Sequence, residues 1–195
     1  MRGTVWMAAI ILTFATLVVN GQDHSIGLRL GYPLGITYKG YLAGNHAFEF
    51  LIGTAPSGWS TSYYEKSFNK FDDFDNYQYE GHRVRNTVYL QGRYDFQYNI
   101  PVDGMVGTLD WYWGAGAILK FASVEYRYTT VEPPKNPYYD TVTDVDFGPE
   151  FAGGMEYTFE DVPITLFGEV SVMMELVNRP IILRGFAGVG GRFRF

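Results

Sequence analysis

The chain has 195 residues, of which 18% are aromatic, with 23 glycines, no cysteine and a formal net charge of −6. So many aromatic residues exclude a disordered chain, and the lack of cysteine excludes a disulfide scaffold or a cysteine-ligated zinc site. The acidic charge argues against a nucleic-acid partner, because nucleic-acid-binding proteins present a basic face.

The first 21 residues have the composition of a secretory signal peptide. Arg2 supplies a positive charge, residues 6–19 are almost wholly apolar, and Gly21 is a small residue before Gln22. A charged start, a short apolar run and a small residue at the cleavage point are typical of such a peptide. The run is shorter than the about 20 residues that cross a bilayer as a helix, so we favour a signal peptide over a membrane anchor. We expect cleavage near Gly21, which leaves residues 22–195 as one mature domain.

After Gln22, apolar and polar residues alternate with a period of two, which predicts β-strands with two unlike faces. In residues 86–98, for example, Val88, Leu90 and Tyr94 share one face, and Arg93 and Asp95 share the other. The alternation recurs, in chain order, at residues 26–30, 36–39, 48–52, 86–98, 109–121, 145–159, 164–177 and 187–195. These segments predict about eight strands, several of them longer than the usual 5–6 residues.

The length of the apolar faces distinguishes two kinds of β protein. A soluble sandwich or lipocalin-like barrel buries its apolar face and exposes its polar face to water. Here the apolar faces run on almost uninterrupted, and the polar faces mix both charges with glycine. A transmembrane barrel has this arrangement, with apolar side chains toward lipid, a polar interior and no unpaired edge. We therefore predict an all-β fold, a transmembrane antiparallel up-and-down β-barrel of about eight strands, over a soluble β protein.

The connections between the predicted strands differ in length at the two ends. Short turns are expected at residues 43–46, 101–107 and 160–163, and long loops at residues 54–85 and 129–144. Short inner turns and long outer loops are typical of outer-membrane barrels. The first outer connection, at residues 33–35, is very short, so one continuous first strand is an alternative that would change the strand count.

Five segments rich in glycine and aromatic residues lie in order along the chain, at residues 26–31, 35–40, 111–116, 153–157 and 191–195. In this order they resemble the small bacterial outer-membrane β-barrel family, the porin-like or OmpA-like eight-stranded barrels. The resemblance covers nearly all of residues 22–195 and implies an integral protein of the bacterial outer membrane, surrounded by its lipid. It also implies that the terminal Phe195 is the signal recognised by the barrel insertion machinery.

The charged residues of the polar faces are expected inside the barrel: Arg29, Lys39, Glu49, Arg93, Asp95, Asp110, Lys120, Glu150, Glu156, Glu169, Glu175, Arg192 and Arg194. The interior of an eight-stranded barrel is just wide enough for side chains to fill, and unpaired charges are costly to bury. We therefore expect ion pairs that fill and close the barrel. Passive transport of small solutes through an open pore is the alternative.

The long outer loop carries an aromatic set that could contact a partner: Trp59, Tyr63, Tyr64, Phe68, Phe71, Phe74, Tyr77 and Tyr79. Such side chains give a large contact area at a small cost in entropy, which suits protein or glycan binding. The alternative is an ordered extension of the barrel wall. The sequence thus favours a structural or interaction role, for instance as an accessory subunit of an envelope complex whose partner it does not identify.

Residues that could carry chemistry are sparse. His24, His46 and His82 are far apart in sequence, and no Gly-x-Ser-x-Gly motif is present. Residues 72–76 are acidic but lack the glycine and closing glutamate of a calcium loop. We therefore predict no catalytic site, metal or cofactor, and a lipid-modifying barrel enzyme is the least favoured alternative.

Overall fold

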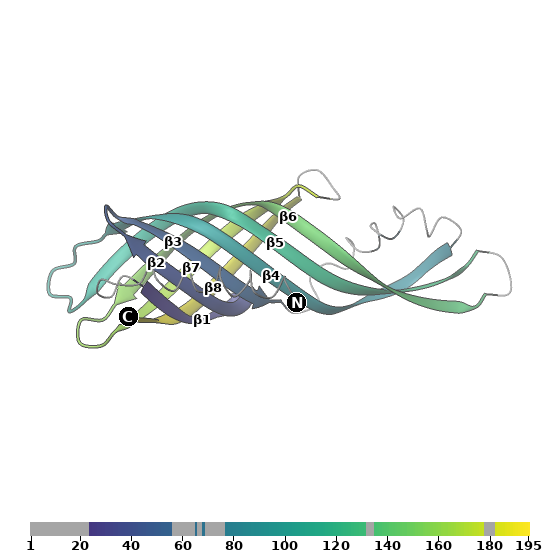
Figure 1. The fold of residues 1–195 in the computed structure, drawn as a ribbon, viewed down its shortest axis with the longest axis horizontal. Coiled ribbons are helices and arrows are strands. Elements are labelled where there is room, and N and C mark those ends of the chain that lie inside the picture. The colour runs from purple at the N-terminus through teal and green to yellow at the C-terminus, as the bar shows by residue number, and fades with distance from the viewer. Residues whose placement is uncertain (1–23, 56–64, 66–67, 69–76, 132–134, 178–181) are drawn as a thin grey trace, which may run out of the picture.

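The computed structural model describes residues 24–55, 65, 68, 77–131, 135–177 and 182–195. Eight antiparallel strands pair in chain order, and the first closes on the last to form a barrel (Figure 1). They are β1 (His24–Tyr32), β2 (Leu34–Leu42), β3 (His46–Thr54), β4 (Tyr77–Asn99), β5 (Thr108–Thr130), β6 (Pro137–Thr158), β7 (Ile164–Glu175) and β8 (Ile182–Arg194). The predicted fold class is confirmed. The signal peptide predicted for residues 1–21 lies outside the described residues and stays a prediction.

Pro33 separates β1 from β2, so the alternative of one continuous first strand is wrong. The short turns lie where the sequence predicted them, between β2 and β3, β4 and β5, and β6 and β7. Both the start of β1 and the end of β8 lie at this end of the barrel (Figure 1). We call it the short-turn end.

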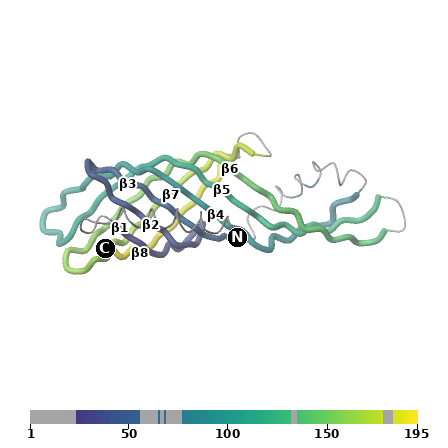
Figure 2. The backbone as a smooth tube through the Cα atoms, viewed as in Figure 1, coloured from purple at the N-terminus to yellow at the C-terminus, as the bar shows by residue number. Residues whose placement is uncertain are grey.

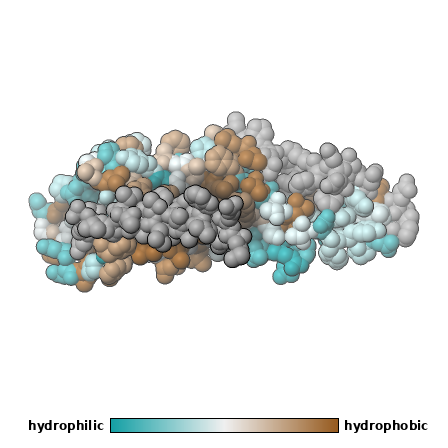
Figure 3. Space-filling model, in the orientation of Figure 1, coloured by the Kyte–Doolittle hydropathy of each residue, from teal (hydrophilic) through white to brown (hydrophobic). Residues whose placement is uncertain are grey.

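The alternation along each strand sorts side chains between the outside and the inside of the barrel. On β7, Leu166 and Val170 point outward and are 48% and 64% exposed, whereas Glu169 and Ser171 point inward and are buried. On the face of the molecule seen in Figure 3, much of the barrel surface is apolar, and the strands that project from the barrel have a more polar surface. Among the described residues, no helix is both long and apolar enough to cross a membrane.

Three strands continue well beyond the barrel at the end opposite the short turns. β4 and β5 have 23 residues each and β6 has 22, whereas the other five have 9 to 13. β3 pairs with β4 only as far as Gly53 and Tyr89, and the ladder between β7 and β6 starts at Met173 and Glu150. Residues 77–88, 121–130 and 137–146 therefore form an open three-stranded sheet, the extension (Figures 1 and 2).

The extension corrects the predicted outer loops, because residues 77–85 and 137–144 belong to strands. Register shifts between Tyr79 and Gly81 and between Val84 and Asn86 each change which face the following residues occupy. The period of two is therefore broken in the sequence although the strand continues. In residues 140–144 threonine alternates with aspartate or valine, so no apolar face marks this part of the strand.

Candidate functional site

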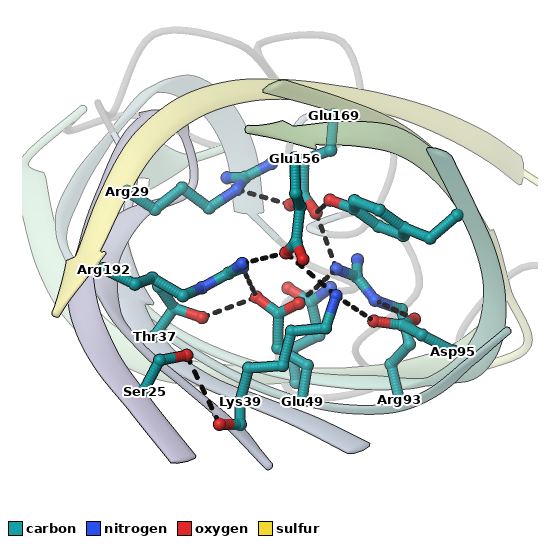
Figure 4. A network of polar contacts seen from close by, with 12 residues as sticks. Ser25, Arg29, Thr37, Lys39, Glu49, Arg93, Asp95, Glu156, Glu169 and Arg192 are labelled. Atoms are coloured by element: carbon teal, nitrogen blue, oxygen red, sulfur yellow. Dashed lines mark hydrogen bonds and ion pairs between the residues drawn. The ribbon is translucent and has the colours of Figure 1, made fainter. Parts of the chain in front are cut away.

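The barrel interior at the short-turn end holds a network of ion pairs (Figure 4). Arg29 of β1 donates from Nε to Glu169 Oε1 of β7 at 2.7 Å. Arg93 of β4 donates from Nη2 to Glu49 Oε2 of β3 at 2.7 Å and to Glu169 Oε2 at 2.6 Å. These contacts run both between neighbouring strands and straight across the barrel.

A second set of contacts joins the remaining strands to the same network. Arg192 of β8 pairs with Glu49 Oε1 at 2.5 Å and with Glu156 Oε1 of β6. Lys39 of β2 lies 2.9 Å from Glu156 Oε1 and 3.3 Å from Asp95 Oδ2. The β5 strand contributes Tyr112, whose hydroxyl donates to Glu169 Oε2 at 2.9 Å. Four cations and four anions thus balance within a network that reaches all eight strands.

An apolar layer lies next to this network, toward the extension. Its buried members are Tyr89, Ile118, Met173 and Phe186. Tyr32 stacks on Phe186 with ring centroids 5.2 Å apart, and its hydroxyl lies 2.7 Å from that of Tyr89. These side chains come from β1, β4, β5, β7 and β8, and they form an apolar cluster inside the barrel.

A second charged layer follows at the mouth of the barrel. Lys120 Nζ lies 2.5 Å from Asp146 Oδ2, and Arg184 Nε lies 2.6 Å from Glu175 Oε2. Nearer the first network, Glu150 accepts two hydrogen bonds, at 2.7 and 2.9 Å, from the amide of Gln91, which precedes Arg93 on the inner face of β4. The interior is therefore filled in layers, charged, apolar and charged again.

The structure places the predicted interior charges inside the barrel and buries all of them except Asp110 and Arg194. Those two are half-buried at the short-turn end, where Asp110 accepts a 3.3 Å hydrogen bond from Asn99 and Arg194 lies over the Tyr41 ring. The prediction did not include Thr37, Tyr112, Asp144, Asp146 and Arg184 or the apolar layer. The sequence signal that could have identified them is that each occupies an inward-facing position of the alternating pattern.

The predicted outer-loop contact residues need one correction. Phe68 is 1% exposed and packs against Val84, Tyr126 and Tyr128 in the core of the extension, so it is a packing residue and is not available to a partner. Tyr77 and Tyr79 are partly buried against the same core. The other five, Trp59, Tyr63, Tyr64, Phe71 and Phe74, lie outside the described residues. The most exposed aromatic residues in the described part of the extension are instead Tyr139 and Tyr138, at 64% and 41% exposure.

The three histidines lie near strand ends or in the extension and contact aromatic residues. His24 Nδ1 lies 2.8 Å from the Tyr38 hydroxyl, and His46 packs against the ring of Tyr94. Within the described residues, no group of three or more histidine, aspartate or glutamate side chains could hold a metal ion. Phe195 lies at the seam of the barrel, where its N–H donates to the His24 carbonyl at 2.9 Å.

His82, in the extension, gives a pH-dependent prediction. Burial lowers the pKa of His82 below its usual 6.5, and the Glu65 carboxylate offsets part of this shift. The unfolded chain then binds a proton more readily than the folded one, so the extension should lose stability as the pH falls through about 6.5 and below. Hydrogen exchange of the extension amides against pH checks this. His82→Gln should remove the acid sensitivity, and an unchanged pH profile in that variant would contradict the assignment.

The fold and its interior define an eight-stranded up-and-down barrel that is apolar outside, filled by paired charges inside and prolonged by a three-stranded sheet. No protein-family model matches the chain, and no curated protein matches it. Among solved structures, it is similar to the N-terminal β-barrel domain of Pseudomonas aeruginosa OprF, with 12% sequence identity and a TM-score of 0.52, over 90% of this chain and 100% of that domain.

A second similar structure is Ail, the attachment invasion locus protein of Yersinia pestis, with 10% identity and a TM-score of 0.47 over 88% of this chain and 93% of that one. Its complex with the heparin analogue sucrose octasulfate gives the same identity and TM-score. The OprF domain has the OmpA-like fold of small outer-membrane barrels, and this chain has that fold too.

Proposed function

We propose that this chain is an integral β-barrel of the bacterial outer membrane, closed to solutes, that presents its extension to a partner. The observation that carries this proposal is the balanced charge network, which joins all eight strands and fills the interior. A chain built in this way would be exported through residues 1–21 and inserted with Phe195 as its recognition signal.

The outer wall supports a place in lipid. Its outward side chains are apolar on every strand, and several of them, such as Leu28 and Val189, are about as exposed as Val170. Near the short-turn end, Trp111 stacks on Tyr98 and Trp113 on Phe96, with ring centroids 4.9 and 4.5 Å apart. Aromatic residues in such a position are typical of the girdle at a membrane interface.

The interior argues against passive transport. An eight-stranded barrel is only wide enough to be filled by side chains, and here those side chains bind one another. The apolar layer of Tyr89, Ile118, Met173 and Phe186 adds a segment with few groups to hydrate an ion. We do not propose an enzymatic role, because His24 and His46 contact aromatic side chains and the sequence has no Gly-x-Ser-x-Gly motif.

Planar-bilayer recording tests the closed barrel. We expect the inserted chain to give no stable single-channel steps, because charged and apolar side chains occupy the interior in the three layers described above. Heat-modifiable mobility in gels serves as the control that the barrel has folded and inserted. Stable, repeated conductance steps from folded protein would favour the alternative, passive transport of small solutes.

Affinity capture tests the interaction role. The intact chain, used as bait, should retain a partner from solubilised outer membranes or from the surface of a neighbouring cell. Replacing the exposed Tyr138 and Tyr139 with serine should weaken that capture. Equal capture by both forms would place the contact elsewhere on the chain.

A further inference from the structure

The β6 strand has an unpaired edge in the extension. On one side, β6 pairs with β5 without a register shift from Pro137 to Thr158. On its other side, β7 ends at Glu175, and no described strand pairs with residues 137–143. Unpaired backbone groups on an exposed edge are a template for another strand.

Two hydrogen bonds show which residues point to this edge. The Leu176 N–H donates to the Phe147 carbonyl at 3.0 Å, so the backbone groups of Phe147 face away from β5. In an antiparallel strand, the N–H and C=O of one residue point to the same side, and successive residues alternate. Tyr139, Thr141 and Thr143 therefore face the open edge. Consistent with this, the Thr141 N–H donates to the Asp140 carboxylate at 2.8 Å and not to β5.

We propose that this edge pairs, antiparallel and around a two-fold axis at Thr141, with the same edge of a second copy of this chain. The axis is perpendicular to the sheet, so the two barrels point in opposite directions. Two copies in one membrane point the same way, which places the second copy in a facing membrane. The proposal rests on the interaction role argued above and names the partner.

The charges along the edge select this register. With Thr141 opposite itself, Tyr139 lies opposite Thr143 and Asp140 lies opposite Val142. Pairs of threonine across antiparallel strands are favourable, whereas like charges directly opposite one another are destabilising. Sliding one copy by two residues places Asp140 opposite either Asp144 or the second Asp140. Pairing about Thr141 is thus the register with a long overlap in which no aspartate lies directly opposite another aspartate.

The other edge of the extension, on β4, fits this kind of pairing less well. Its register against β5 shifts between Tyr79 and Gly81 and again between Val84 and Asn86. Bulges interrupt the regular row of N–H and C=O groups and twist the strand, which hinders strand addition. The regular β6 edge is therefore the docking surface.

Disulfide trapping of the full chain tests the register. Because the chain has no cysteine, Thr141→Cys introduces a single thiol. Hydrogen-bonded antiparallel pairs have Cα atoms about 5.5 Å apart, within the range of a disulfide. Two vesicle populations of phosphatidylethanolamine and phosphatidylglycerol, each with a differently tagged chain, are mixed and oxidised. We expect a mixed-tag dimer from T141C and none from S123C, whose residue lies one strand inward on β5.

Vesicle tethering, measured by light scattering, tests the backbone contact without a cysteine. Thr141→Pro removes the edge N–H, which β5 does not use, and should weaken tethering by about tenfold. The matched variant Thr141→Val keeps the N–H and should tether as the original chain does. Asp140→Ala removes the carboxylate that competes for this N–H and should tether more strongly.

The outcomes separate this proposal from the proposed function. Three results would each overturn the second copy as the partner. They are equal tethering by T141P and T141V, tethering by D140A no stronger than that of the original chain, and the absence of a mixed-tag dimer. If the same protein is folded and closed in planar bilayers, the proposed barrel function would stand. A chain that does not insert into vesicles would instead overturn the proposed function and, with it, this pairing.

Discussion

Replacing Glu49 with alanine is expected to lower the free energy of unfolding of the barrel by about 3–5 kcal/mol. Glu49 is 3% exposed and accepts hydrogen bonds from Arg93, Arg192 and Thr37 at 2.7, 2.5 and 2.5 Å. Without its carboxylate, two buried guanidinium groups lose an anion, and the network carries a net positive charge. Urea unfolding of the chain in lipid vesicles, followed by tryptophan fluorescence, measures the change.

The matched control is an exposed ion pair of the extension. Glu80 Oε2 lies 3.1 Å from Arg127 Nε, and the two side chains are 35% and 52% exposed. Water and salt screen such a pair, so Glu80→Ala should change the free energy of unfolding by less than about 1 kcal/mol. If Glu49→Ala were no more harmful than Glu80→Ala, the interior network would not be what stabilises the barrel.

The sequence predicted which face each charge of the barrel occupies but not which partner it has. Arg29 binds Glu169, 140 residues away, and Arg192 binds Glu49, 143 residues away. A period of two distinguishes inside from outside. The height of a side chain along the barrel depends on the stagger between strands, which the pattern of one strand does not contain.

The sequence allowed an ordered extension of the barrel wall as the alternative to a contact loop, and the structure confirms that alternative. Its strands were not located in the sequence, for a related reason. The interaction interpretation placed Phe68 on a loop surface, because aromatic side chains in an outer loop give a large contact area at a small cost in entropy. Its burial depends on Val84 and Tyr126, and the strand that holds Val84 was hidden by the bulge beside it. Long alternating segments were therefore predictable, whereas a strand with bulges and a single residue that packs onto it were not.

Placing an arginine on the outer wall is the most direct test of membrane insertion. Val170 lies near the middle of β7, is 64% exposed and is flanked in register by Gly153 and Ala187. If this wall faces the hydrocarbon core, Val170→Arg should destabilise the inserted barrel by about 2–4 kcal/mol. The same change on a surface that faces water should have little effect, because the guanidinium stays hydrated. Urea unfolding in vesicles again provides the measurement.

Val131 supplies the comparison, because it is 59% exposed and directly follows β5 in the extension. Val131→Arg makes the same chemical change at nearly the same exposure, and it should shift the free energy of unfolding by at most about 0.5 kcal/mol. Because the two valines are about equally exposed, a difference between the variants in the free energy of unfolding would come from the medium around each side chain, lipid or water. Equal, small effects at both positions would mean that the apolar wall faces water, and a soluble barrel would then explain the fold.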